Sequence, residues 1–200
     1  MSNGTIAVSQ LEMLTQSGTG TITINPPNTD TDRVLTLPDE SGTVDTLQRS
    51  GNVIQVVNFQ TGALATGTTV IPFDDTIPQI TEGNEFMTLA ITPTNASNIL
   101  VIQVFAAQLG VNAISAMTAA LFQDSAVNAL ASAVAIIPTS GYVTSLAFSY
   151  RMTAGTTSAT TFKLRAAGDA AGTTTFNGAN SGRRLGGVSM SSITITEYTP

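Results

Sequence analysis

Stretches in which apolar and polar positions alternate recur along most of the chain. Apolar residues occupy every second position in 87–91, 146–152 and 162–166, with Thr, Ala, Ser, Lys or Arg between them. Because successive side chains of a strand point to opposite faces, this period of two predicts strands with one face in a core and one in water. Pro, Gly and Asn end these stretches, and the 33 threonines suit a pleated surface. The pattern predicts an all-β chain of antiparallel strands.

The segment Ile99–Phe105 departs from this alternation, because its residues are apolar on both faces. Such a run is typical of a strand that is covered on both sides. We therefore expect a central strand whose residues lie in the core or in a contact between subunits, namely Val101, Gln103, Val104 and Phe105.

The alanine-rich segment 113–137 admits two interpretations. Propensity alone favours a helix. Polar residues interrupt the apolar content between 123 and 128, however, and 113–118 fits a strand equally well. We favour two strands joined by a loop at 123–129, with a helix as the alternative.

Near the C-terminus the apolar positions change phase. Val188 and Met190 lie in one phase, and Ile193 and Ile195 lie in the other. Since a slip of one residue inverts the two faces of a strand, we expect a bulge or break at Ser191–Ser192.

Residues 1–50 differ from the rest in composition. They are rich in Thr, Gly, Asp and Pro and lack long apolar runs, with short alternating pieces at 21–24 and 34–37. Two short strands do not stabilise themselves, but three copies of the chain could wind them into a stalk. The break near residues 50–52 predicts an N-terminal attachment and stalk segment, 1–50, and a C-terminal β-sandwich, 51–200.

The chain carries few charges for its apolar content. Hydrophobic residues make up 42% of the sequence and charged residues 10%, and the mean hydropathy is +0.23. A monomer of 200 residues would have difficulty hiding that much apolar surface. Another copy of the same chain can cover it, so we expect a closed symmetric oligomer.

The composition also excludes several chemistries. Cys and His are absent, which removes Ser-His-Asp triads, Cys-His pairs, disulfides and the usual zinc sites. A net charge of −6 with seven Lys and Arg disfavours nucleic acid. Phosphate-loop and dinucleotide fingerprints, a secretory signal and a long apolar span are missing from the sequence. We expect no enzyme, no catalytic residue, no cofactor, no nucleic-acid partner and no membrane insertion.

Short motifs follow one another in order between residues 20 and 197. They are Gly20–Ile24, Pro26–Pro27, Asp32–Asp39, Gly42–Val44, Ile71–Gln79, Glu82–Gly83, Ile91–Pro93, Leu185–Val188 and Ile193–Glu197. The first four resemble shaft or attachment parts of tailed-bacteriophage fibre proteins, tail or head fibres, and the others resemble the opening and close of a C-terminal domain in phage virion proteins. The resemblance implies a homotrimeric fibre protein whose C-terminal domain is a jelly-roll sandwich similar to those of the tumour-necrosis-factor and C1q type. It implies no catalytic residues, and it locates the chain in the virion after synthesis in the host cytoplasm.

The expected function is host attachment by binding alone. The N-terminal segment would join other virion proteins of the baseplate, tail or capsid, and the sandwich would display polar loops to a host-surface glycan or protein. The alternatives are a capsid decoration or head-fibre protein that stabilises the shell, and a polysaccharide depolymerase. The loop residues that we expect to touch the host are Gln123, Asp124, Ser125, Asn128, Thr139, Ser140 and Tyr142.

Three further groups each have a functional and a plainer interpretation. Asp74–Asp75, with Glu82 and Glu85, offer oxygen ligands for Ca²⁺, but the regular spacing of a calcium loop is absent and Asp also starts tight turns. We therefore expect no metal. Arg183–Arg184 would hold a carboxylate of a sugar or of a neighbouring subunit, or form a solvated turn. Asn177–Gly178 is typical of a tight turn, and needs no function.

Overall fold

The computed structural model describes residues 11–14, 21–24 and 50–200. The chain divides into two units, Met1–Val44 and Asp45–Pro200. In the first unit, β1 (Leu11–Leu14) pairs antiparallel with β2 (Thr21–Ile24), which confirms the strand predicted at 21–24. The strand predicted at 34–37 lies outside the described residues. The attachment and stalk role of residues 1–50 stays a prediction.

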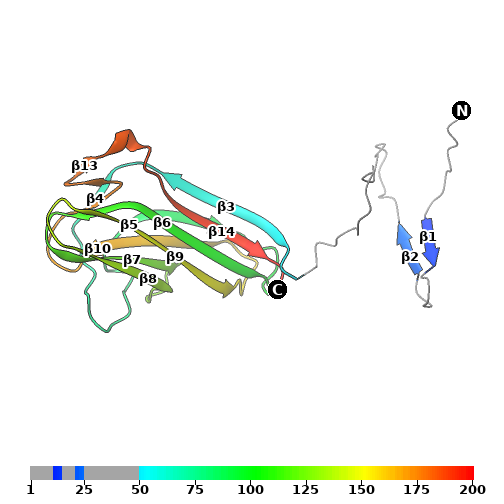
Figure 1. Ribbon diagram of the computed structural model, residues 1–200. Coiled ribbons are helices and arrows are strands. Elements are labelled where there is room, and N and C mark those ends of the chain that lie inside the picture. Colours follow the sequence, from blue (N-terminus) through cyan, green and yellow to red (C-terminus); the bar gives the residue numbers. More distant parts are fainter. Residues whose placement is uncertain (1–10, 15–20, 25–49) are drawn as a thin grey trace, which may run out of the picture. The chain divides into compact units, whose positions relative to one another are not determined.

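The second unit is a sandwich of two antiparallel sheets (Figure 1). The four-stranded sheet has the order β5-β10-β7-β8, and the six-stranded sheet has the order β3-β14-β6-β11-β4 with β9 paired to β6. A small hairpin and a single 3₁₀ turn complete the described elements. The strands are β3 (Val53–Thr61), β4 (Ala65–Gly67), β5 (Asn84–Ile91), β6 (Ile99–Val111), β7 (Ser115–Gln123), β8 (Ala131–Ile137), β9 (Val143–Thr153), β10 (Thr160–Gly168), β11 (Thr174–Phe176), β12 (Gly178–Ala179), β13 (Gly182–Arg183) and β14 (Ser191–Tyr198), and the 3₁₀ turn is Leu185–Gly187.

The connectivity of the long strands is that of a jelly roll. The chain crosses from one sheet to the other, and its last strand, β14, returns to pair with β3 and β6. In the facing sheet β10 returns in the same way to lie between β5 and β7. Eight strands arranged in this double Greek key define the jelly-roll sandwich. The prediction of an antiparallel all-β sandwich is confirmed.

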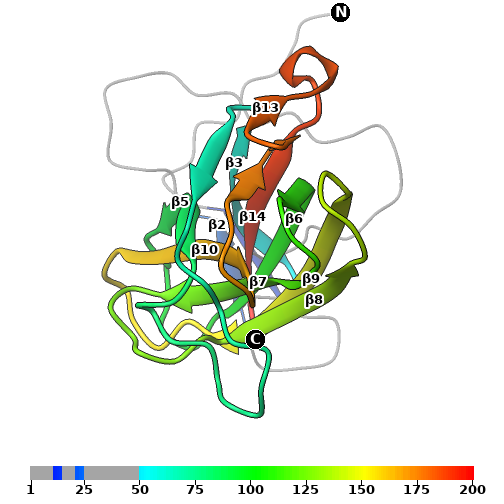
Figure 2. The same cartoon turned by 90° about the vertical axis from the view of Figure 1, so that its left-hand side faces the viewer.

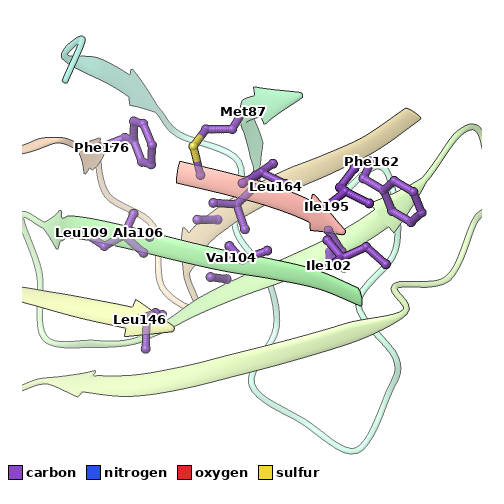
Figure 3. Close-up of a cluster of buried hydrophobic side chains, with 14 of the residues drawn as sticks. Met87, Ile102, Val104, Ala106, Leu109, Leu146, Phe162, Leu164, Phe176 and Ile195 are labelled. Atoms are coloured by element: carbon purple, nitrogen blue, oxygen red, sulfur yellow. The ribbon is translucent and has the colours of Figure 1, made fainter. Parts of the chain in front are cut away.

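The core lies between the two sheets and is formed by the predicted faces. Figure 3 shows Ile102 and Val104 of β6 among apolar side chains from β10 and β14. Met87, Leu146 and Phe162, each on a face predicted from the alternation, are buried. Burying one such side chain stabilises the fold by about 1.5–3 kcal/mol. The period of two thus identified the core side of these strands correctly.

The central strand β6 has two different faces. Val104 is 3% exposed and belongs to the core, whereas Phe105, on the opposite face, is 42% exposed. Gln103 is exposed and Val101 is half-buried on the same outer face as Phe105. The prediction of a central strand is confirmed, since β6 pairs with β14 on one side and β9 on the other. Within the single chain, however, one of its two faces is open.

Segment 113–137 forms two strands, β7 and β8, and the predicted loop lies between them. β7 is paired on both sides, with β10 and β8, and is buried from Ser115 to Phe122. Two sets of ladder hydrogen bonds and complete burial outweigh the helix propensity of alanine, because propensity is a weak preference that tertiary contacts override.

The sandwich has two ends. At one end, which we call the base, the chain enters at Gly51–Val53 and leaves after Tyr198, and these segments are joined by backbone hydrogen bonds (Figure 1). The antiparallel registers place the loops 92–98, 124–130 and 154–159 at the base as well. The opposite end, the tip, carries the loops 62–64, 112–114, 138–142, 169–173 and 177–190.

Candidate functional site

The seven predicted host-contact residues lie at opposite ends of the sandwich. Asp124, Ser125 and Asn128 belong to the β7–β8 loop at the base, with Gln123 at the end of β7 beside it, and Thr139, Ser140 and Tyr142 belong to the β8–β9 loop at the tip. The length of β8 separates the two loops, so they do not form one site.

The loop at the base uses its polar side chains internally. Asp124 accepts hydrogen bonds from the Thr160 hydroxyl (2.8 Å) and the Thr161 backbone N–H (2.7 Å). Gln123 donates to the same hydroxyl at 2.9 Å. In the same loop the Asn128 side chain accepts from the Gln79 amide, at 2.9 Å. These side chains hold the loop in place rather than facing a ligand.

We expect Asp124→Ala to lower the free energy of unfolding by about 1–2 kcal/mol, because two hydrogen bonds to a carboxylate are lost. Asp124→Asn should cost less, since Asn keeps an acceptor and tolerates the φ of 49° found there. Chemical denaturation of both variants measures the difference. Ser125→Ala is the matched control, because Ser125 is exposed and makes no side-chain hydrogen bond within the described chain. Equal losses in all three variants would contradict the structural role of Asp124.

The tip exposes a group of large apolar side chains that sequence reasoning missed, apart from Tyr142. Tyr142 itself is 50% exposed, beside the exposed Thr139 and Ser140. The others are Leu64, Ile114, Leu185, Val188 and Met190. Leu185, Val188 and Met190 belong to one loop, whereas Leu64, Ile114 and Tyr142 belong to three others, so no periodic pattern in the sequence could have grouped them.

Much of the tip is formed by one excursion of the chain, residues 177–190, between β11 and β14 (Figure 2). The tight turn of its hairpin is Asn180–Ser181, with φ of 49° and 56°, and not the predicted Asn177–Gly178. Val188 is 79% exposed and lies outside β14. The phase change predicted at Ser191–Ser192 therefore arises because the strand begins at Ser191.

The outer face of the six-stranded sheet is a second surface of interest. Cross-strand pairing puts three rows of side chains on it, and these rows are Val56–Thr196–Val101–Arg151, Asn58–Thr194–Gln103–Ser149 and Gln60–Ser192–Phe105–Ala147. Arg151 is the one charged residue in these rows. A shallow groove of about 480 Å³ crosses the face beside Gln103 and Phe105. The surface combines small polar with apolar side chains and nearly lacks charge.

The four carboxylates considered for Ca²⁺ do not converge. Asp74 accepts hydrogen bonds from the hydroxyl and the backbone N–H of Thr76, which lower the pKa of its carboxyl and form a tight turn. Glu82 accepts from the backbone N–H of Gln79, and Glu85 faces two cations on β10. Among the described residues no three acidic side chains gather where a metal ion could sit.

Two carboxylates are built into the ends of the sandwich. At the tip, the Ser115 hydroxyl is the main cause of a lowered pKa of Asp169, which also accepts from the Ala116 backbone N–H at 2.9 Å. At the base, Glu197 is 0% exposed. Burial raises the pKa of Glu197, but hydrogen bonds from Gln55, Asn98 and Thr94 outweigh burial and hold it below 4.5. Both carboxylates are used structurally.

Comparison with known proteins gives distant likenesses. No family model matches the sequence, and no curated protein matches it. Among solved structures, the C-terminal domain of EclA, described as a sugar-binding protein, has 15% identity and a TM-score of 0.29 over 80% of this chain and 82% of that one. Infectious bursal disease virus, Gx strain, has 12% identity and a TM-score of 0.33, over 88% of this chain and 47% of that one.

A third likeness is to the enzymatically active domain of tailspike protein 4 of bacteriophage CBA120. It has 16% identity and a TM-score of 0.25, over 64% of this chain and 19% of that one. At such TM-scores these likenesses carry no inference, and the fold rests on the strand pairing described above. No helix long and apolar enough to cross a membrane occurs among the described residues.

Proposed function

We propose that the chain is a structural fibre protein of a bacteriophage virion, a homotrimer that joins the particle through residues 1–50 and presents the sandwich to the host surface. The order of phage-like motifs along the sequence supports this, together with the jelly-roll connectivity that the resemblance implied. The activity is binding without catalysis, and the partners are other virion proteins and a surface glycan or protein of the host.

The observation that carries the proposal is the outer face of the six-stranded sheet. Phe105 and Val56 are 42% and 56% exposed on a face that holds a single charge. Exposed apolar side chains on a sheet face with so little charge favour a contact with another protein. We take this protein to be a second copy of the same chain, because copies of one chain are always present together and in equal amounts.

A second surface with exposed apolar side chains lies on β8, an edge strand of the other sheet. Val134 and Ile136 of this strand are 45% and 61% exposed. The two surfaces belong to one sandwich and cannot cover each other within it. A contact between β8 of one copy and the sheet face of the next would be heterologous, and such contacts leave no open surface when they close a ring. A ring of three fits the trimer of the resemblance.

In this arrangement the tip faces the host, because the chain that leads to the attachment segment enters at the base. Three tips per trimer bind together, and multivalency can raise the overall affinity by about 10² to 10⁴ without new contacts. Weak sites for sugar hydroxyls are then sufficient for attachment.

Removal of residues 1–50 tests the proposed division of roles. We expect the truncated chain to fold and to remain a trimer by light scattering, since the surfaces described above all lie in residues 50–200. Particles assembled with it should lack the protein, whereas a label on the full chain should appear on intact particles by electron microscopy. The position of that label also distinguishes tail from capsid attachment.

Each result has a clear meaning. A truncated chain that still joins particles would contradict the attachment role, and one that fails to fold would contradict the predicted domain boundary. A full chain that behaves as a 20.6 kDa monomer would remove the trimer.

A further inference from the structure

We propose that the excursion 177–190 binds an acidic polysaccharide, and that Arg183 and Arg184 hold an anionic group of the sugar, a carboxylate or a phosphate. The inference rests on the proposed function, since it assigns a ligand chemistry to the tip. Figure 1 shows the hairpin with β13 standing out from this end of the sandwich.

The first argument is the distribution of positive charge over the sandwich. Lys163 and Arg165 face Glu85, at 3.9 and 3.8 Å. Arg183 and Arg184 are exposed and have no carboxylate partner in the described part of the chain. In the described chain they are two positive charges without an acidic partner, in a protein whose net charge is −6. An anionic ligand would supply that partner, because guanidinium matches carboxylate and phosphate through paired hydrogen bonds.

The second argument is that the excursion is held in one position. Asn177 is 2% exposed, and its amide donates to the carbonyl oxygens of Thr61 (2.9 Å) and Ala63 (3.1 Å). The Ser191 hydroxyl donates to its side-chain oxygen at 2.6 Å. Gly62 approaches the same segment so closely that a Cβ there would lie 2.0 Å from the carbonyl oxygen of Gly187. A site fixed in advance loses little entropy when a ligand binds.

The third argument is the backbone beside the two arginines. Leu185 has a φ of 51°, a conformation that a bulky residue rarely adopts, and its side chain is 71% exposed. Burial does not stabilise this conformation, and strained residues of this kind cluster at functional sites. Leu185 and Val188 are exposed and lie next to Arg183 and Arg184 in the chain, so this segment presents apolar and cationic groups side by side. Sugar rings present apolar C–H faces and, in acidic polysaccharides, anionic groups.

The ligand class follows from this combination. A neutral glycan would leave the two guanidinium groups without partners, and a carboxylate on another subunit would use them inside the trimer. The binding experiment separates these cases with three probes: polygalacturonate carries carboxylates, phosphomannan carries phosphates, and dextran carries no charge.

The full-length protein is measured against each probe by calorimetry at two salt concentrations. We expect binding to polygalacturonate, phosphomannan or both, weakened by salt, and no binding to dextran. The double substitution Arg183→Gln and Arg184→Gln should weaken binding at least tenfold. The double substitution Arg183→Lys and Arg184→Lys, which keeps the charge but loses the fork, should give an intermediate affinity. Lys163→Gln, which removes a positive charge elsewhere on the sandwich, should leave binding unchanged.

Several results would overturn the inference. These are equal binding of dextran, binding of neither acidic probe, full binding by the double Gln variant, or a loss of trimer in that variant, which would assign the arginines to a subunit contact. The proposed function is judged separately, by the mass of the unmodified protein and by its presence on particles. A trimer that joins particles but binds neither acidic probe therefore removes this inference alone.

Discussion

Phe105→Asp is expected to convert the proposed trimer into single folded chains. The aspartate would lie in the middle of the outer face of the six-stranded sheet, where cross-strand pairing places Ser192 and Ala147 beside it. Burying a carboxylate between subunits without a partner costs roughly 2–3 kcal/mol per contact or more, which corresponds to a roughly 30- to 150-fold weaker association. Light scattering on a dilution series measures the change.

Two variants test whether the effect belongs to this face. Val104→Asp puts the same charge one residue away but inside the core, where Val104 is 3% exposed, so the chain should unfold and lose its β circular dichroism signal. Thr88→Asp puts it at an exposed position of β5 in the other sheet, and should leave the proposed trimer intact. If Phe105→Asp stays trimeric at micromolar concentration, the outer face is not the contact.

Val104 and Phe105 also show how much of the fold the sequence could predict. The alternation from 146 to 152 identified the core side of β9 because a strand with one buried face must repeat every two residues. In β6 both faces are apolar, so the pattern predicted a central strand correctly but not which side each residue takes. Val104 and Phe105 differ in burial because one faces the second sheet and the other faces outward.

The location of the loops was beyond sequence reasoning. The predicted contact residues Ser125 and Tyr142 are 17 positions apart in the sequence but lie at opposite ends of the sandwich. The reason is that β8, which connects their two loops, runs from one end of the sandwich to the other. The apolar side chains at the tip, by contrast, come from distant segments that the fold brings to one end. Conversely, Arg183 and Arg184 were found as a pair because they are adjacent in the chain, but the absence of a carboxylate partner for them among the described residues is a property of the fold.

Glu197 is the clearest example of a residue whose surroundings are set by the fold and not by the local sequence. In the sequence it is one acidic residue near the end of a predicted strand, and in the structure it is 0% exposed. Its carboxylate accepts hydrogen bonds from the side chains of Gln55 (2.5 Å) and Asn98 (2.6 Å), and from the hydroxyl and backbone N–H of Thr94 (both 2.8 Å). These donors come from segments that are far apart in the chain, so no local pattern could have revealed the site.

This carboxylate should make the stability of the sandwich depend on pH. Burial raises the pKa of Glu197, but the four donated hydrogen bonds hold the folded-state pKa below the ordinary value of 4.5. The unfolded chain then binds the proton more readily than the folded one, so the stabilisation is present above about pH 4.5 and is lost as the pH falls through the lower, folded-state pKa. Asp169, whose pKa is also lowered, contributes in the same direction.

Glu197→Gln isolates the contribution of this group. At pH 7 the variant should unfold about 2–4 kcal/mol more easily, because it loses the charge and points an N–H₂ group at donors that need an acceptor. Between pH 5 and pH 3 its stability should fall less steeply than that of the unmodified protein, so the two curves converge in acid. Urea denaturation at each pH measures both. Asp75→Asn is the matched control, since Asp75 is exposed and makes no hydrogen bond or ion pair within the described residues. Parallel curves for Glu197→Gln and the unmodified protein would show that the buried carboxylate is not the group that titrates.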